Sequence, residues 1–217
     1  MPNLLQYQTS LYLRQHLDQP VDWMVWTDET LKLAKTQGKP IFLSIGYAGS
    51  HWCHVMAKES FNDPNVAALL NKHFVCIKVD REERPDLDKI YLSALQLLTQ
   101  RGGGWPLNLF LDPDSLLPFF GAAYIPGKTS SHAAEPGFAD LVTGLHQAFA
   151  EQREQIAEQG IKLGAMLQSL YPPALDPEMD DDELLLITGK ELTERYDGAE
   201  GGFGNSIKFA MPTSLER

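Results

Sequence analysis

The stretch GSHWCHVM at residues 49–56 holds the side chains best suited to redox chemistry. Cys53 stands three residues after Ser50, where a second cysteine would complete a C-x-x-C dithiol motif. Dithiol exchange needs two sulfurs, because one thiolate attacks a disulfide and the other resolves the mixed disulfide. A serine hydroxyl is far less acidic than a thiol, and no base is evident to activate it. We therefore predict that this chain does not cycle as a dithiol–disulfide oxidoreductase.

Ser50 also has a structural interpretation, which we favour. Serine is a preferred N-cap residue, worth about 1 kcal/mol to a helix that starts after it. Cys53 would then lie in the first turn of that helix, between His51 and His54. The helix N-terminus and basic neighbours favour a thiolate, whereas burial favours the thiol, and the sequence leaves both open. Mixed-disulfide formation by one cysteine with a small thiol therefore stays an alternative.

Histidine and cysteine are metal-ligating types as well. Three of them within four residues, His51, Cys53 and His54, fit one tetrahedral site poorly, and no second cluster supplies further ligands. We expect no metal and no other cofactor.

Short apolar runs alternate with helical patterns along the first 160 residues. KPIFLSIGY (39–47) and FVCIKVD (74–80) have the length and composition of buried strands, and Cys76 is expected to be a small buried hydrophobe. LNLFLD (107–112) and PFFGAAYIP (118–126) indicate a hairpin. Helical patterns lie at 27–37, 50–57, 64–74, 86–100 and 138–159.

This order predicts an α/β fold. Strands that alternate with helices and close on an antiparallel pair form a central mixed sheet flanked by helices. That is the layout of the thioredoxin fold, and the motif at 49–56 follows the first core strand. Ligands of open α/β sheets bind beyond the carboxyl ends of strands. Asp80 and Arg81 end the second strand, so we expect them to face the same cleft as Cys53.

Composition narrows the class of protein. The 217 residues are 43% hydrophobic, which predicts a soluble globular protein with a substantial core. The net charge is −11, and residues 171–200 hold 10 acidic side chains against Lys190 and Arg195. No basic stripe is present, so nucleic acid is not an expected partner. No membrane-spanning run and no secretory signal are visible, and with two cysteines we expect free thiols and a cytoplasmic location.

The C-terminal part of the sequence, from residue 171 onwards, differs from the rest in composition. YPPALDPEMDDDE (171–183) is rich in proline and acid, so a linker is expected there. DELLLITGKELTERY, which follows, predicts a helix with Asp182 as its N-cap. We expect residues 1–170 to form the thioredoxin-like domain, with an N-terminal helical extension. Residues 184–217 are expected to be the start of an all-α domain that is cut short.

Four strings resemble a known family: QPVDWMVW (19–26), the segment KPIFLSIGY…HWCHVMAKESF (39–61), VDREERPDLDKIY (79–91) and GGWPLNLFLDPD (103–114). Together they are similar to the thioredoxin-like N-terminal domain of the spermatogenesis-associated protein 20 family. GGFGNSIKF (201–209) resembles the opening of that family's second domain, an (α/α)6 barrel related to six-hairpin glycosidases and sugar epimerases.

The resemblance has several implications. The family usually has cysteine at the position of Ser50, so this chain carries S-H-W-C in place of C-H-W-C. The Trp105–Pro106 bond is expected to be cis, although only about 5–6% of such bonds are. Trp52 and Trp105 either wall a ligand site or pack in the core. The residues expected around a ligand cleft are His51, Trp52, His54, Asp80, Arg81, Trp105 and Pro106.

Three functions follow as hypotheses. The first is a binding or accessory module with a degenerate S-x-x-C site. The second is a single-cysteine oxidoreductase that uses Cys53 with a protein or a small thiol as partner. The third is the N-terminal part of a carbohydrate-active enzyme whose chemistry belongs to the barrel, which would also be the partner domain in longer members.

Overall fold

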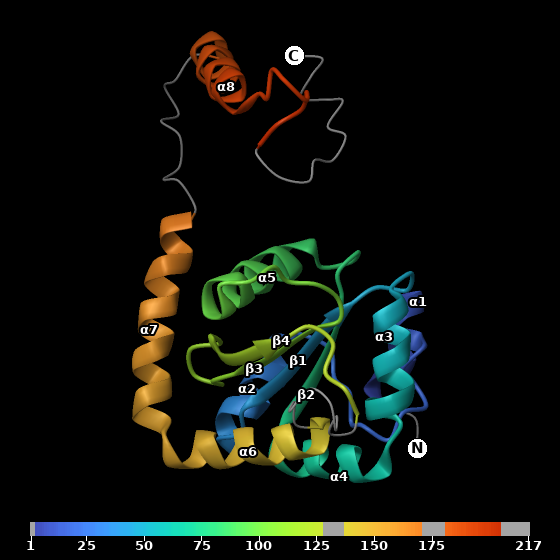
Figure 1. The fold of residues 1–217 in the computed structure, drawn as a ribbon. Coiled ribbons are helices and arrows are strands. Elements are labelled where there is room, and N and C mark those ends of the chain that lie inside the picture. Colours follow the sequence, from blue (N-terminus) through green and yellow to red (C-terminus); the bar gives the residue numbers. More distant parts are fainter. Residues whose placement is uncertain (1–2, 128–136, 171–180, 205–217) are drawn as a thin grey trace. The chain divides into compact units, whose positions relative to one another are not determined.

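The computed structural model describes residues 3–127, 137–170 and 181–204. Its contacts divide the chain into two compact units, Met1–Tyr171 and Pro172–Arg217. In the first unit a four-stranded sheet lies among helices (Figure 1).

The sheet has the strand order β2-β1-β3-β4. β1 (Ile41–Gly46) runs parallel to β2 (Val75–Asp80) and antiparallel to β3 (Leu107–Leu111). β3 pairs antiparallel with β4 (Pro118–Ala122), which confirms the expected hairpin and the mixed sheet. Every residue of β1, β2 and β3 is buried, which explains why these strands read as nearly continuous apolar runs.

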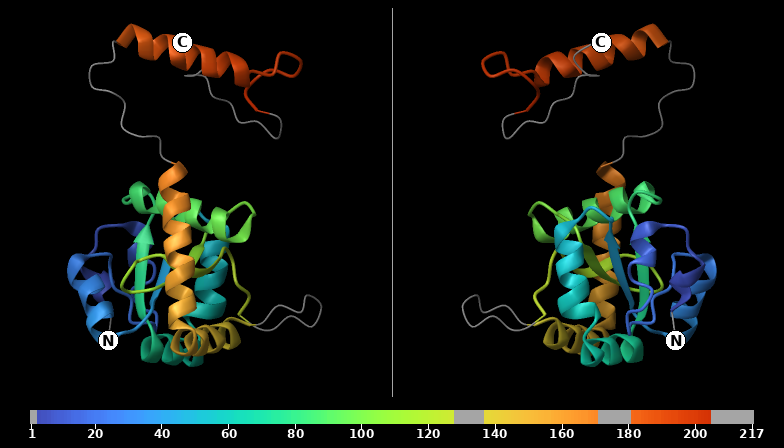
Figure 2. Two further views of the ribbon diagram at one scale, coloured as in Figure 1. Left: turned by 90° about the vertical axis from the view of Figure 1, so that its left-hand side faces the viewer. Right: turned by 90° about the vertical axis from the view of Figure 1, so that its right-hand side faces the viewer.

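Helices cover both faces of this sheet (Figures 1 and 2). Side chains alternate along a strand, so each strand contributes to two cores. Phe42, Cys76 and Phe110 face one core. It is closed by α3 (His51–Met56), α4 (Pro64–His73), α6 (Phe138–Glu151) and the N-terminal segment.

The other core contains Leu43, Ile77 and Leu109. It is closed by α2 (Asp28–Gln37), which Thr27 caps, and by α5 (Pro85–Thr99).

The N-terminal segment is anchored to the sheet by backbone and side-chain contacts. It begins with a short 3-10 helix, η1 (Leu4–Tyr7), and the single turn α1 (Leu11–Arg14). Met24 then pairs with β2, accepting from the Lys78 amide and donating to the Cys76 carbonyl, both at 2.9 Å. The segment therefore covers the free edge of β2 and lies over the first core.

The single helix expected at 138–159 is wrong, because two helices occupy this region. Gln152 leaves the helical conformation (φ −123°, ψ 34°) between α6 and α7 (Arg153–Leu170). α7 then turns sharply away (Figure 1) and packs Leu163 and Leu167 against α5. No glycine or proline lies at this break between the two helices. Contacts between α7 and other elements of the unit keep it in place.

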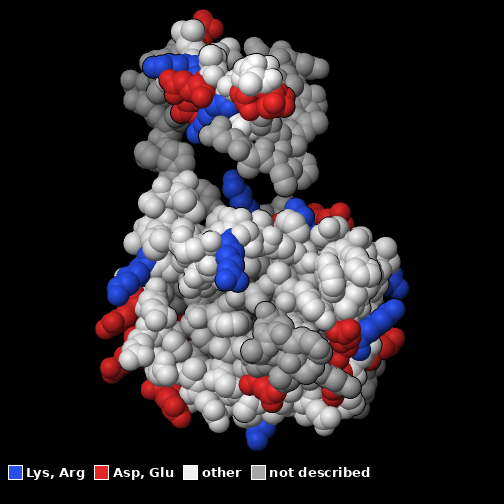
Figure 3. Space-filling view, in the orientation of Figure 1, with Lys and Arg blue, Asp and Glu red and all other residues white. Residues whose placement is uncertain are grey.

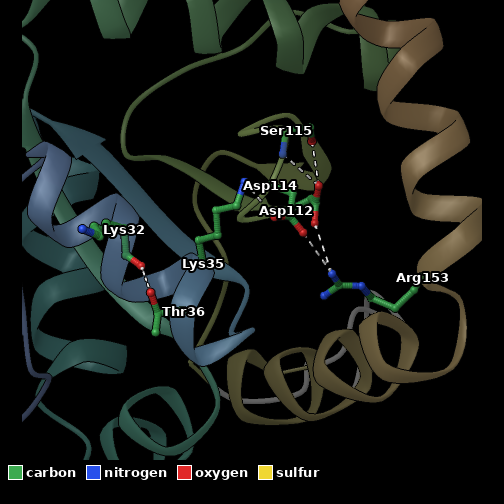
Figure 4. Close-up of polar contacts among 7 residues, drawn as sticks. All are labelled: Lys32, Lys35, Thr36, Asp112, Asp114, Ser115 and Arg153. Atoms are coloured by element: carbon green, nitrogen blue, oxygen red, sulfur yellow. Dashed lines mark hydrogen bonds and ion pairs between the residues drawn. The ribbon is translucent and has the colours of Figure 1, made fainter.

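Those contacts centre on Arg153. Its guanidinium lies 3.4 Å from Asp114 and 3.9 Å from Asp112, in the β3–β4 turn (Figure 4). Lys35 of α2 reaches Asp114 from the other side at 3.3 Å. Arg153 also lies over the ring of Phe149, 4.2 Å from its centroid. The start of α7 is thereby tied to the hairpin.

The second unit contains α8 (Asp181–Arg195) and a turn closed by a bridge between Tyr196 and Phe203. α8 begins at Asp181, so Asp182 lies inside the helix and is not its N-cap. Most of the linker expected at 171–183 lies outside the described residues.

Charged side chains are dispersed on the face shown in Figure 3, and neither sign forms a continuous patch there. Among the described residues, no helix combines the length and the apolar character that a membrane crossing requires.

Candidate functional site

The helix that carries the cysteine begins at Ser50. The Ser50 Oγ accepts a hydrogen bond from the Cys53 amide at 3.4 Å, which is the N-cap arrangement that the sequence favours. Ser50 is buried, with 6% of its surface exposed, and Cys53 is buried with 2% exposed. The structure thus places a hydroxyl at the first position of the motif and a covered thiol at the second.

The loop before β3 lies against this helix start. The Trp105–Pro106 peptide bond is cis, the isomer expected from the resemblance. The Ser50 hydroxyl donates to the Trp105 carbonyl at 3.5 Å, a long hydrogen bond that links the two segments. Residues 55 positions apart in the sequence therefore meet at the site.

Trp105 is held in a cluster of four side chains, which we call the Trp105 cluster: Tyr47, Arg81, Asp88 and Trp105. The Trp105 indole Nε1 donates to Asp88 Oδ1 at 2.7 Å, and the Arg81 Nε pairs with Asp88 Oδ2 at 3.2 Å. The Arg81 guanidinium lies 3.9 Å from the Trp105 ring centroid, within cation–π range. Tyr47 meets the Trp105 ring edge-on at 6.0 Å.

The outer side of α3 is exposed. His51, Trp52 and His54 all face solvent, and Trp52 has 52% of its surface accessible. The Trp52 ring lies 4.8 Å from that of Tyr124, beyond β4. His54 donates from Nε2 to the Ala48 carbonyl at 2.7 Å, so it braces the loop that precedes the helix. Trp52 therefore lies at the surface beside the site, whereas Trp105 is partly buried and packs against both cores.

Asp80 does not line an open cleft beside Cys53, as the sequence had led us to expect. It is buried, and its Oδ2 accepts from the hydroxyl of Ser10 at 2.6 Å. Its Oδ1 accepts from the Glu82 amide at 2.9 Å. Asp80 and Cys76 share one face of β2, so the carboxylate turns towards the N-terminal segment, whereas its neighbour Arg81 joins the Trp105 cluster.

The Cys53 sulfur meets a tyrosine from the N-terminal segment. Tyr12, in α1, has 1% of its surface exposed, and its hydroxyl has no hydrogen-bond partner of good geometry. A Cβ placed on Gly46 would collide with the Tyr12 hydroxyl and would lie 2.6 Å from the Cys53 sulfur, so both atoms crowd the same point above β1. Burial raises the pKa of Tyr12 well above its usual value, and Cys53 and Asp80 add to that increase.

A buried lysine lies in the same core. Lys78 of β2 has 1% of its surface exposed, and its Nζ donates to the Ser44 hydroxyl at 3.0 Å. The amine also lies 4.4 Å from the ring centroid of Phe61 and 5.3 Å from that of Tyr12. Burial lowers the pKa of Lys78 to about 7, and the nearby Cys53 opposes that decrease. An amine so poorly solvated is costly to keep in a core.

Sequence reasoning missed Tyr12, Ser44, Lys78 and Asp88. The burial of Lys78 and Ser44 could have been predicted from the sequence. They lie two residues after Cys76 and Phe42 in their strands and so share the same buried face. The position of Tyr12 could not, since it depends on how the N-terminal segment returns over β2. Among the described residues, no three His, Cys, Asp or Glu side chains are grouped to hold a metal.

Three features together define a thioredoxin-like protein. The sheet is mixed and four-stranded, a helix begins after its first strand at the S-x-x-C motif, and a cis-proline lies against the start of that helix. The chain belongs to the family described as "Protein of unknown function, DUF255" (Thioredox_DsbH), whose model matches residues 2–168.

Curated relatives match nearly the whole chain. It is 36% identical to spermatogenesis-associated protein 20 of Homo sapiens over 99% of its own length and 27% of that protein. It is 38% identical to the uncharacterised protein B0495.5 of Caenorhabditis elegans, over 99% of this chain and 28% of the relative. The chain thus spans about a quarter of the length of these relatives.

Similar solved structures include one titled DsbH oxidoreductase, at 19% identity and a TM-score of 0.43, which covers 61% of this chain and 86% of that one. Another is a thioredoxin from Thermus thermophilus, at 22% identity and a TM-score of 0.43, which covers 59% of this chain and 87% of that one.

Proposed function

We propose that this chain is a thioredoxin-fold domain with a degenerate S-x-x-C site, which acts as a binding or accessory module and not as a dithiol oxidoreductase. The observation that carries the proposal is Ser50, whose hydroxyl caps α3 at the position of the attacking sulfur. With one buried sulfur at the site, nothing resolves a mixed disulfide from within the chain.

The partner of such a module would meet the exposed side chains around α3 and the Trp105 cluster. Trp52 offers apolar surface there, while Arg81 and Asp88 hold the Trp105 ring in place. The proposed partner is a protein or a small thiol, and in longer family members the helical barrel as well. Carbohydrate chemistry by that barrel, like a cytoplasmic location, stays a prediction.

The test is reduction of insulin by dithiothreitol, with wild-type protein and the Ser50→Cys variant compared. We expect the wild type to leave the uncatalysed rate unchanged. Ser50→Cys should accelerate the reaction, because the substitution supplies the missing sulfur at an intact helix start. The double variant Ser50→Cys/Cys53→Ser is the matched control and should be inactive. Catalysis by the wild type at the rate of Ser50→Cys would refute the proposal.

A second function is favoured by one specific observation, the buried amine of Lys78 near the Cys53 thiol. A single-cysteine oxidoreductase needs groups that stabilise the Cys53 thiolate. Lys78, whose pKa burial lowers to about 7, supplies a positive charge in this core around and below that pH. Perturbed buried groups of this kind gather at functional sites. Mixed-disulfide formation between native protein and oxidised glutathione, read by mass spectrometry, tests this function, with Cys76 as the internal comparison.

A further inference from the structure

We propose that the Tyr12 hydroxyl is a hydrogen-bond donor to the Cys53 thiolate, so that the N-terminal segment contributes a residue to the site. This inference rests on the second proposed function, the single-cysteine chemistry, and names the group that supports it.

The first argument is the unpartnered hydroxyl. Tyr12 is fully enclosed, yet its Oη has no hydrogen-bond partner of good geometry in the resting structure. A buried hydroxyl without a partner costs free energy, and native structures rarely retain one without a reason. A neutral thiol is a weak acceptor, whereas a thiolate is a charged one. Ionisation of Cys53 would therefore give Tyr12 the acceptor that it lacks.

The second argument is the way the two groups are brought together. Gly46 ends β1 without a side chain, and the space that its Cβ would fill is shared by the Tyr12 hydroxyl and the Cys53 sulfur. The Ser10 hydroxyl caps α1 by accepting from the Leu13 amide at 3.0 Å and donates to Asp80 at 2.6 Å. α1 is thereby fixed to the end of β2, and this anchor sets the position of Tyr12.

The third argument is the charge around the sulfur. Tyr12 keeps its proton at neutral pH, because burial raises its pKa well above the usual value. It therefore remains a donor when Cys53 ionises. The other charged or titratable groups on the elements packed there include His16 and the exposed Arg14 of the N-terminal segment, Cys76, Lys78 and Asp80 of β2, and the exposed His51 and His54 of α3. Among them, Lys78 is close enough to Cys53 for the sulfur to raise its pKa.

The reaction that this donor would assist is one thiol–disulfide exchange. The Cys53 thiolate attacks a sulfur of a disulfide such as oxidised glutathione, and a new Cys53–sulfur bond forms. The original sulfur–sulfur bond breaks, and its electron pair leaves on the second sulfur as a thiolate. Tyr12 donates a hydrogen bond before the attack and transfers no proton.

The experiment compares wild type, Tyr12→Phe and Tyr91→Phe. Tyr91 is the matched control, a buried tyrosine whose hydroxyl donates to the Leu116 carbonyl at 3.0 Å, far from the sulfur in sequence and on the other core. The primary measurement is the ultraviolet absorbance of the thiolate against pH, with the Cys53→Ala protein subtracted. This signal does not require a reagent to reach the buried sulfur. Circular dichroism melting checks that each variant folds.

We expect the midpoint of the thiolate signal to lie about one pH unit higher in Tyr12→Phe than in wild type. At pH values well below both midpoints the thiolate fraction should fall about tenfold, while Tyr91→Phe leaves the midpoint unchanged. Identical midpoints in wild type and Tyr12→Phe would overturn the inference.

A parallel reaction with oxidised glutathione separates this inference from the function on which it rests. If native wild type forms no mixed disulfide but Tyr12→Phe still shifts the thiolate signal, the donor is real and the single-cysteine function is refuted. If wild type reacts and Tyr12→Phe has the same midpoint and the same rate, the function stands and the role of Tyr12 is refuted.

Discussion

The Trp105 indole donates a hydrogen bond to Asp88 at 2.7 Å, across 17 positions of the sequence. Asp88 lies in the first turn of α5, and Trp105 precedes the cis-proline beside Ser50. Because Asp88 also pairs with Arg81 at 3.2 Å, one carboxylate fixes both partners of the cation–π contact. Asp88 therefore fixes the positions of Trp105 and Arg81 at the site.

Asp88→Ala should release the Trp105 ring. The indole N–H and the Arg81 guanidinium lose their shared acceptor, and we expect a loss of about 1–3 kcal/mol in the free energy of unfolding. The Trp105 indole proton should also exchange faster with solvent in NMR spectra. Asp86→Ala is the control, because its ion pair with Arg84 is exposed and should be worth less than about 1 kcal/mol. Equal losses in the two variants would contradict this role.

Gly46→Ala should destabilise the protein. The added Cβ would collide with the Tyr12 hydroxyl and crowd the Cys53 sulfur, so one of these buried groups must move. We expect a loss of about 1–3 kcal/mol in urea denaturation, typical of an overpacked core. Gly144→Ala is the matched control, since its added Cβ meets nothing within 4 Å in α6 and should stabilise the helix by about 0.5–1 kcal/mol. A Gly46→Ala variant with wild-type stability would show that the absence of a side chain at this position is not required.

Lys78→Met should stabilise the protein at neutral pH by about 1–4 kcal/mol, because it replaces a buried amine with an apolar side chain of similar size. The pH dependence gives a sharper test. The folded pKa of Lys78 is lowered from 10.5 to about 7, so the unfolded state binds more protons between these values. The free energy of unfolding should therefore rise with pH in this window in wild type, and this rise should be lost in Lys78→Met.

Urea denaturation at several pH values above 7 measures that slope. Lys72→Met, an exposed lysine on α4, is the control and should keep the wild-type slope. A Lys78→Met protein that is both less stable and equally pH-dependent would contradict the description of a costly buried amine.

His16 should contribute to acid destabilisation. Burial lowers its pKa from 6.5 to about 2 and the nearby Lys78 adds to that decrease, so the native state holds it neutral, although the hydrogen bond from its Nδ1 to Gln19 at 3.0 Å acts in the opposite direction. Below pH 6.5 the unfolded state takes up a proton that the native state refuses until about pH 2. Stability should therefore fall as the pH drops through this window, by up to about 1.4 kcal/mol per pH unit from this residue.

His16→Gln should flatten that slope, although it also loses the packing of the imidazole on Tyr12 at every pH. The measurement is the free energy of unfolding between pH 4 and 7, where the slope and not the absolute value is the readout. His51→Gln, at an exposed histidine, should keep the wild-type slope. If both variants titrate alike, His16 is not the group responsible.

Much of the fold is predictable from the sequence. The strands at 39–47, 74–80 and 107–112 lie within one or two residues of β1, β2 and β3, because unbroken apolar runs bounded by turn residues have few other solutions. Asp63 and Pro64 mark the start of α4, and Gly38 ends α2 in the left-handed region. The break at Gln152 is the exception, since the ion pairs of Arg153 that hold it are long-range.

The candidate site divides in the same way. The sequence by itself determined the helix start at Ser50, the cysteine one turn later and the absence of a second sulfur, because these depend on residue types at short spacing. The environment of Cys53 was decided by the tertiary structure alone. Tyr12, Gly46 and Lys78 come from the N-terminal segment, β1 and β2, and only the paired strands and the segment folded over them bring these groups to one sulfur. Local sequence cannot encode such contacts, since each depends on the register and packing of elements far apart in the chain.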